Sequence, residues 1–136
     1  MRRYRLIEHT ADIGLIAYGA SLPEAFANAA YGMFSIIANL RPVREVESRA
    51  VEVTAGDPES LLFEWLNHLI YIFEVDNLLL KRFDVTRLTD HELRATCYGE
   101  KVDTNRHHLK IGIKSATYHK LVVDKARNRV QVIFDI

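Results

Sequence analysis

The stretch SLPEAFANAAYGMFSII, from Ser21 to Ile37, decides how the chain folds because it carries the signals of an amphipathic helix. Ser21 and Glu24 form a capping box, in which the Ser21 hydroxyl accepts the amide of residue 24 and Glu24 reaches back to the amide of Ser21. Pro42 predicts an end near Asn39, because proline disfavours helical geometry at the residue before it. Apolar residues recur along one face at steps of three and four, namely Phe26, Ala29, Ala30, Met33, Phe34 and Ile37. This helix must therefore lie on an apolar surface.

A second helix begins at Asp57-Pro58, where aspartate can cap the first turn and proline takes a position that needs no amide hydrogen. Its apolar face is broad, which predicts burial on more than one side. The residues of this face are Leu61, Leu62, Trp65, Leu66, Leu69, Ile70 and Phe73.

Most of the remaining chain alternates between apolar and polar residues and is predicted to form strands. The predicted strands cover residues 3–8, 13–18, 44–54, 83–85, 92–98, 110–117, 119–123 and 130–136. In the third of these the alternation changes phase, which predicts a bulge near residues 49–51.

The elements follow the order strands, helix, strand, helix and then a run of strands. This order lacks the regular alternation of a parallel doubly wound fold, so we predict an α+β protein. Its mostly antiparallel sheet would carry the two long helices, and a faint repetition of strand, helix and strand suggests two related modules. With 136 residues and no linker or low-complexity segment, the chain is predicted to form a single domain over residues 1–136.

The charges balance, with 18 Lys and Arg against 18 Asp and Glu. This balance argues against a surface that wraps nucleic acid or an anionic membrane by bulk charge, although it leaves room for a local basic patch. We therefore expect no strong direct nucleic-acid binding, and no membrane association, because no stretch approaches the ~20 apolar residues of a membrane span. The single cysteine, Cys97, has no intramolecular disulfide partner, which is typical of a reducing cytoplasm, and is expected to be buried in a strand.

The usual catalytic signatures are missing, since the sequence has no GxGxxG, GxxxxGK, nucleophile elbow or HExxH motif. One polar cluster stands out, the turn EHTADIG at residues 8–14. His9, Thr10 and Asp12 are candidates for a site there, and Gly14 would permit a close approach of the backbone. The alternative for His9 and Thr10 is an ordinary turn, in which the side chains bond local amides.

The strand pattern continues to the last residue, which predicts that this end of the chain is held in a sheet. Asp135 should then project from the face opposite Phe134, beside the terminal carboxylate of Ile136. Together with Asp12, these groups would form an oxygen-rich pocket for a hard cation such as Ca²⁺ or Mg²⁺. The alternative is that Asp135 faces water at the edge of the sheet.

Lys114 is predicted to share a strand face with Gly112 and Ala116, so that little side-chain bulk surrounds it. A lysine in this setting is commonly solvated. It could also be a cation held next to carboxylates or to a phosphate of a ligand.

The chain resembles the archease family along its whole length, and the pair of HTADIG with a terminal FDI is specific. The motifs that carry the resemblance are YRLIEHTADIG (4–14), SLPEAFANAAYGMF (21–34), LLFEWLNHLIYIFE (61–74), GEKVD (99–103), HHLKIGIKSATYHKL (107–121) and VIFDI (132–136). The chain departs from the family pattern at residues 101–102 and 111–112 and within 113–119.

The resemblance implies two strand–helix–strand–strand modules, one inserted in the other. It implies a cytoplasmic protein cofactor, not itself an enzyme, of the GTP-dependent RNA-splicing ligase RtcB. Such a cofactor promotes guanylylation of the ligase and its repeated turnover in tRNA exon ligation. The resemblance also implies a divalent cation, calcium first and magnesium or manganese as alternatives, bound by Asp12, Asp135 and the terminal carboxylate of Ile136.

For activation of the partner, the resemblance points to Asp12, Asp135 and Lys114, the last as the counterpart of an essential basic residue of the family. The candidates for a supporting role are His9, Thr10 and His119.

Two other functions stay open at this point. An RNA-binding module, or a chaperone for a tRNA-modifying enzyme, would make a tRNA methyltransferase a second expected partner. A small metal-dependent phosphoesterase would use the same carboxylates, with His9 or His119 as the acid–base group.

Overall fold

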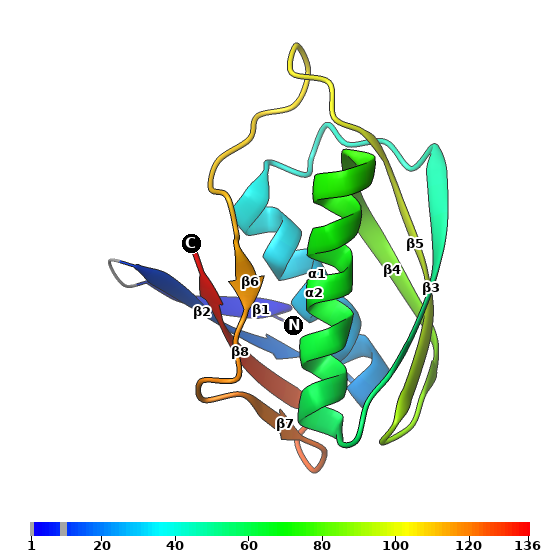
Figure 1. Cartoon of the computed structure of the whole chain (residues 1–136), viewed down its shortest axis with the longest axis vertical. Coiled ribbons are helices and arrows are strands. Elements are labelled where there is room, and N and C mark those ends of the chain that lie inside the picture. The colour runs from blue at the N-terminus through cyan, green and yellow to red at the C-terminus, as the bar shows by residue number, and fades with distance from the viewer. Residues whose placement is uncertain (1, 9–10) are drawn as a thin grey trace.

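The computed structural model describes residues 2–8 and 11–136. In this part of the chain, helices α1 (Leu22–Ile37) and α2 (Pro58–Asp76) are accompanied by eight strands (Figure 1). The strands are β1 (Tyr4–Glu8), β2 (Asp12–Tyr18), β3 (Glu47–Thr54), β4 (Leu78–Leu88), β5 (Glu92–Lys101), β6 (Ser115–Ala116), β7 (Val122–Asp124) and β8 (Arg129–Asp135). Neither of the helices in the described residues has the length and apolar character needed to span a membrane.

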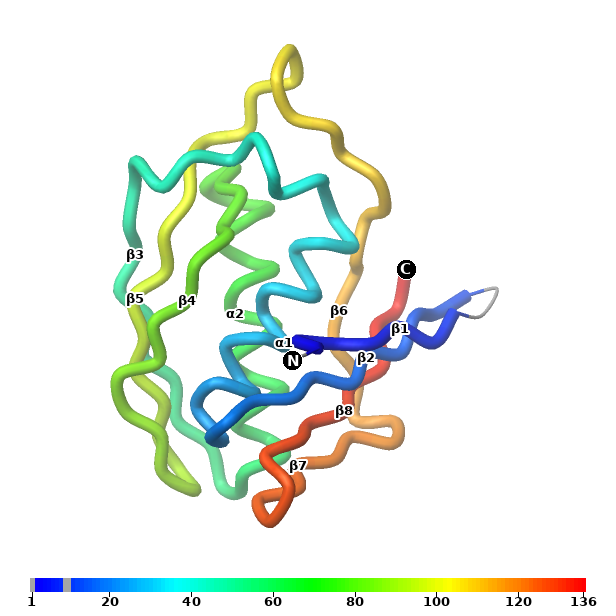
Figure 2. The backbone as a smooth tube through the Cα atoms, turned by 180° about the vertical axis from the view of Figure 1, so that it is seen from behind, coloured from blue at the N-terminus to red at the C-terminus, as the bar shows by residue number. Residues whose placement is uncertain are grey.

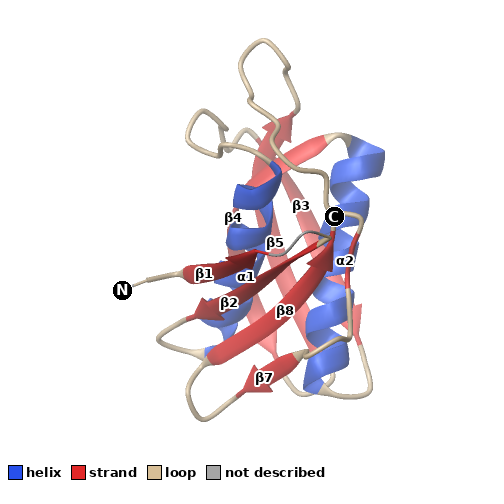
Figure 3. Cartoon of the chain, turned by 90° about the vertical axis from the view of Figure 1, so that its left-hand side faces the viewer, coloured by secondary structure: helices blue, strands red, loops and turns tan. Residues whose placement is uncertain are grey.

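The strands form two antiparallel sheets, and the helices lie between them (Figures 1 and 3). The first sheet has the order β1-β2-β8-β6, with β7 also paired to β8, and the second sheet has the order β3-β5-β4. Each helix contacts both sheets, so each is buried on more than one side. The two helices are joined by a hydrogen bond from the fully buried indole of Trp65 to the carbonyl of Phe26, at 3.0 Å. The predicted α+β class is therefore confirmed, with two sheets in place of one.

The modular organisation is also confirmed by the topology. Residues 47–101 form β3, α2, β4 and β5 in succession and build the whole second sheet. The first sheet combines both ends of the chain, since β1 and β2 join β6, β7 and β8 across this insertion (Figure 2).

The predicted helix signals act as expected at the start of both helices and at the end of α1. The Ser21 hydroxyl accepts the amide of Glu24 at 3.3 Å, and the Asp57 carboxylate accepts the amide of Ser60 at 2.7 Å. Helix α1 ends at Ile37, close to the predicted end. One detail of the capping box is wrong, because the Glu24 carboxylate accepts the amide of Ala20 at 3.1 Å and not that of Ser21.

The predicted bulge near residues 49–51 is wrong. The register between β3 and β5 is unbroken, and the irregularities lie in β4, between Leu80 and Arg82 and between Val85 and Arg87. The apparent change of phase arises because Val46 lies outside the strand and is 69% exposed, while Val51 faces the core. Near the first irregularity β5 needs a glycine, since a Cβ at Gly99 would lie 1.8 Å from the carbonyl oxygen of Leu79.

The strand predicted over residues 110–117 is mostly wrong, because only Ser115–Ala116 is a strand. The preceding backbone pairs with the end of α1: the Lys110 amide donates to the Ile37 carbonyl at 2.7 Å, and the Asn39 amide donates to the His108 carbonyl at 3.1 Å. The last carbonyls of a helix lack partners within the helix, and this segment supplies one. This alternating segment therefore forms hydrogen bonds with the end of α1 and does not form a long strand.

A buried polar cluster fixes the loop that follows β5. The Glu100 carboxylate accepts the amide of Arg44 at 2.7 Å and also pairs with the guanidinium of Arg106 and with His107 Nε2, the latter at 3.0 Å. His107 Nδ1 accepts the amide of Asp103 at 2.8 Å, so its ring hydrogen lies on Nε2 and is donated to Glu100. The hydrogen bond from Arg106 is the main cause that lowers the pKa of Glu100 from 4.5 to about 2.

This lowered pKa predicts how stability depends on pH. The stabilisation by the Glu100 carboxylate is complete above pH 4.5 and is lost as the pH falls toward 2, because the unfolded state takes up the proton before the folded state does. Glu100→Gln should cost about 2 kcal/mol at pH 7, where hydrogen bonds to a charged group are lost. Urea unfolding from pH 7 to pH 2 should show a shallower loss of stability for the variant than for the wild type. Parallel curves would contradict the assignment, and Glu64→Gln, at an exposed helix position, is the control.

Candidate functional site

The pairing of β2 with β8 places two aspartates side by side. Asp12 and Asp135 are direct partners in the antiparallel register. Directly opposed residues of such a pair lie on the same face of the sheet, with Cβ atoms about 4.5–5.5 Å apart. The next partners, Ile13 and Phe134, are buried in the core, so the two carboxylates project from the outer face. The structure therefore agrees with the predicted orientation of Asp135 opposite Phe134.

Asp12 is the unusual member of the pair. Its Oδ1 atom is buried and has no hydrogen-bond partner among the described residues. An unpaired buried carboxylate oxygen is costly, and a second carboxylate directly opposite adds repulsion. A cation held by these two side chains would remove both costs. The arrangement therefore fits a divalent cation that prefers oxygen ligands.

Ile136 lies beside this pair. Its amide donates to the carbonyl of Ala11 at 3.5 Å, and its side chain packs partly against the core. These contacts hold Ile136 next to Ala11, which directly precedes β2. We call Asp12, Asp135 and Ile136 together the acidic end.

Lys114 and Ser115 lie on the other side of Asp135. The Lys114 amide donates to the Asp135 carbonyl at 2.8 Å, and Ser115 is the partner of Asp135 in the register of β6 with β8. Asp12, Asp135 and Ser115 thus form one row across three adjacent strands. The sequence did not single out Ser115, because its place depends on a pairing of only two residues.

The predicted surroundings of Lys114 are corrected by the structure. Ala116 is buried on the core side of the sheet, whereas Lys114 is exposed, so the two do not share an open face. No carboxylate of the described residues lies within ion-pair distance of the Lys114 ammonium group. Its backbone is nevertheless fixed one strand away from the acidic end.

The residues predicted to support the site are not brought to the acidic end by the described part of the structure. His9 and Thr10 lie outside the described residues. His119 is exposed in the turn after β6, and the neighbouring Lys120 carbonyl is bonded by Gln131 at 2.9 Å. Gln131 precedes Asp135 by four residues of an extended strand, which is about 13 Å. The structure therefore does not bring His119 to the acidic end.

Few side chains of the acidic end could serve as ligands of a metal ion. Among residues 2–8 and 11–136, no group of three His, Cys, Asp or Glu side chains could hold a metal ion. A cation at Asp12 and Asp135 would thus need further oxygens from the main-chain carboxylate of Ile136, a hydroxyl or water. Such a set is typical of calcium, magnesium or manganese, whereas zinc and copper prefer imidazole or thiolate.

Two further predictions concern single residues. Cys97 is buried in β5, and burial raises the pKa of its thiol to about 12, so it is a core residue as expected and not a nucleophile. The close approach expected at Gly14 is not present. A Cβ there would meet its nearest atom, the Cβ of Ile7, at an ordinary contact distance of 3.4 Å.

Comparison with known proteins agrees with this architecture. The family described as "Archease protein family (MTH1598/TM1083)" matches residues 4–136. A protein archease of Pyrococcus abyssi is 39% identical over 142 residues and covers 100% of both chains. One from Methanosarcina mazei is 38% identical over 141 residues, or 99% of this chain and 97% of the relative.

Solved structures show the same fold. The solution structure of Methanobacterium thermoautotrophicum protein 1598 is 31% identical, with a TM-score of 0.81 over 100% of both chains. A Thermotoga maritima crystal structure, described as an archease and possible chaperone, is 24% identical, with a TM-score of 0.58 over 100% of this chain and 98% of that one, and shows the fold alone. Because the family match spans almost the whole sequence and the relatives are more than one-third identical, the chain belongs to the archease family.

Proposed function

We propose that this protein activates the GTP-dependent RNA-splicing ligase RtcB, as a protein cofactor and not as an enzyme. It would promote guanylylation of the ligase and its repeated turnover in tRNA exon ligation in the cytoplasm. The observation that carries the proposal is the pair Asp12 and Asp135, which are opposed on adjacent strands while one carboxylate oxygen of Asp12 is buried without a partner among the described residues.

The rigidity of the acidic end suits an activator. Both aspartates belong to strands whose other faces are buried in the core, so their backbones are fixed before any partner binds. A group of fixed charges can complete a partner's metal- and nucleotide-binding site without a nucleophile of its own. This role accords with a sequence that has none of the usual catalytic motifs.

A divalent cation is part of the proposal, with calcium first and magnesium or manganese as alternatives. Asp12, Asp135 and the main-chain carboxylate of Ile136 would hold it. When bound, the cation supplies positive charge that can be directed at phosphate oxygens. Lys114 would add a positive charge from a backbone position that is fixed beside Asp135.

The sequence leaves a second candidate function open. In this alternative, the protein is an RNA-binding module or a chaperone of a tRNA-modifying enzyme such as a methyltransferase. The acidic end would then be a contact surface without a role in nucleotidyl transfer.

The metal site predicts a stability response. With Ca²⁺ at 100 times its Kd, the wild-type protein should gain about 2.7 kcal/mol in its free energy of unfolding. Asp135→Asn should lose this gain. In the presence of EDTA it should be more stable than the wild type by about 0.5 kcal/mol, because the repulsion with Asp12 is relieved. Urea unfolding with Ca²⁺ or with EDTA measures both effects.

Glu64→Gln serves as the control, because it removes an exposed carboxylate of α2 that is not part of the acidic end and should keep the full response to Ca²⁺. An equal gain for the wild type and Asp135→Asn would show that the cation binds elsewhere.

The proposed activation predicts a second set of results. Asp135→Ala, or a C-terminal extension that moves the carboxylate of Ile136, should abolish the stimulation of RtcB guanylylation while leaving the fold intact. Lys114→Gln should reduce the stimulation at least about tenfold, and Lys120→Gln, which removes another exposed lysine, should not. The measurement is guanylylation and multiple-turnover RNA ligation by the RtcB of the same organism, with circular dichroism to verify folding.

Full stimulation by the Asp135→Ala variant would overturn the activator proposal. Stimulation of a tRNA methyltransferase in its place would support the chaperone alternative.

A further inference from the structure

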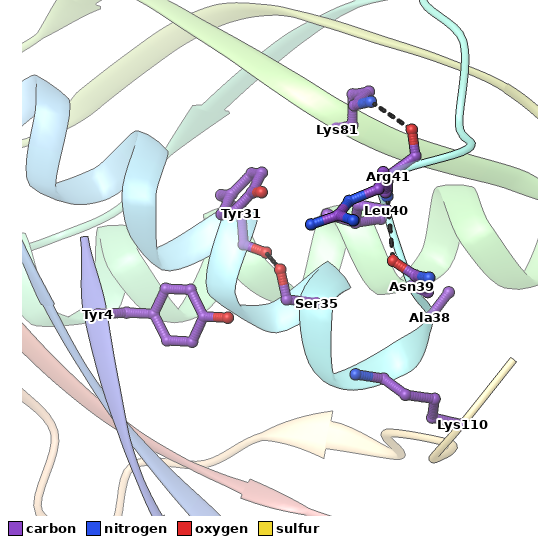
Figure 4. Close-up of a pocket in the computed structure, with 9 residues that line it drawn as sticks. All are labelled: Tyr4, Tyr31, Ser35, Ala38, Asn39, Leu40, Arg41, Lys81 and Lys110. Atoms are coloured by element: carbon purple, nitrogen blue, oxygen red, sulfur yellow. Dashed lines mark hydrogen bonds between the residues drawn. The ribbon is translucent and has the colours of Figure 1, made fainter. Parts of the chain in front are cut away.

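A cavity of about 420 Å³ lies at the C-terminal end of α1 (Figure 4). Separate segments line it: Tyr4 comes from β1, Tyr31 from α1, Arg41 from the loop after α1 and Lys81 from β4, while Lys110 comes from the loop before β6. Its volume falls within the range of small-molecule sites, about 300–1,000 Å³. The residues that line it include three cations and no carboxylate. We call it the cationic cavity.

The three cations have no counter-ions among the described residues. No carboxylate in the described part of the chain lies within ion-pair distance of Arg41, Lys81 or Lys110. Lys81 is half-buried, and its ammonium group donates only to neutral carbonyls, those of Val43 at 2.8 Å and Arg41 at 3.4 Å. Elsewhere the arginines are commonly paired, as Arg82 is with Glu45 and Asp84.

The negative end of the α1 dipole is too weak to balance the three cations of the cavity. A helix C-terminus carries only about half a negative charge, and one of its carbonyls already accepts the backbone amide of Lys110. A neighbouring hollow that shares Lys81 and Tyr31 with the cavity is also lined by Arg3, whereas one that shares Tyr4 and Lys110 with it is lined by Glu8. The three cations of the cavity are therefore available to an anionic ligand.

The two tyrosines indicate what kind of anion fits. The ring of Tyr31 is covered by the guanidinium of Arg3, 4.4 Å from the ring centroid, while the ring of Tyr4 lies 6.3 Å from that of Tyr31. Figure 4 shows Tyr4 and Lys110 pointing toward the last turn of α1 from different segments. Aromatic rings next to cations are the usual means of binding a base together with its phosphate.

We propose that the cationic cavity binds a nucleoside phosphate, with the phosphate at Arg41, Lys81 and Lys110 and the base against Tyr4. A site for one nucleotide agrees with a chain of zero net charge, because it needs three local cations and not a basic surface. The ligand is either a free nucleotide or one residue of a single-stranded RNA. This proposal does not depend on the activator function, since no residue of the acidic end takes part.

The test is isothermal titration calorimetry with AMP at low salt. AMP should bind the wild-type protein, and the double variant Arg41→Gln/Lys110→Gln should weaken binding at least about tenfold, since charge-assisted hydrogen bonds are lost. The matched control is Arg5→Gln/Lys120→Gln, which removes the same number of exposed cations outside the cavity and should keep the wild-type Kd. Both double variants should retain the response to Ca²⁺, which separates this proposal from the proposed metal site.

Variants of Tyr4 test whether the base contacts this ring. Tyr4→Leu should weaken AMP at least about fivefold but leave the affinity for inorganic phosphate unchanged, and Tyr4→Phe should retain AMP binding. A 5′-phosphorylated pentaribonucleotide that binds more than tenfold tighter than AMP would identify RNA as the source of the nucleotide, and equal affinities would identify a free nucleotide.

Three results would overturn the proposal. The first is no binding of AMP or of the pentaribonucleotide. The second is equal weakening by both double variants, which would indicate bulk charge. The third is competition by a pentaglutamate peptide at concentrations similar to those of AMP, which would assign the cavity to an acidic protein segment.

Discussion

The antiparallel ladder between β2 and β8 runs from Asp12 opposite Asp135 to Tyr18 opposite Arg129. It determines both the packing of the core and the position of the acidic pair. On its inner face the ladder aligns buried side chains against the helices, including Leu15 and Val132, which are fully buried. On its outer face the same register opposes two carboxylates. A shift of one residue would move every side chain of β8 to the other face, so the core fixes the acidic pair. The pairing of the apolar inner face therefore also decides where Asp12 and Asp135 stand on the outer face.

Groups of like charge occur at two places in the part of the chain that the structure describes. Asp12 and Asp135 have no ion-pair partner at one end of the first sheet, and Arg41, Lys81 and Lys110 have none around the end of α1. Many other arginines are paired, as Arg106 is with Glu100. The balanced total of 18 positive and 18 negative residues therefore conceals local groups of one sign. In the two proposals, the first group would hold a cation and the second would contact a phosphate directly.

Local signals in the sequence were sufficient to predict much of this structure. The caps at Ser21 and Asp57 act within a few residues, and the alternation of the last strand places Asp135 opposite Phe134 without further information. The sequence could not reveal Ser115, or the use of residues 108–110 to close α1, because both depend on contacts between distant segments. The cationic cavity was missed for the same reason, since its lining residues are scattered from Tyr4 to Lys110. Alternation alone does not say whether a segment pairs with a strand or with a helix end.

The arrangement of the first sheet has a consequence for synthesis and folding. The inserted module of residues 47–101 has all its strands close together in sequence, so it can begin to form its sheet while the rest of the chain is still being made. The strand β2 cannot form its pairing with β8 until late in synthesis, because β8 is translated after every other strand of the sheet. Contacts with so large a sequence separation form slowly, and domains fold as their segments emerge. The acidic end can therefore form only after β8 has been synthesised, and a chain interrupted before β8 cannot present it to a partner.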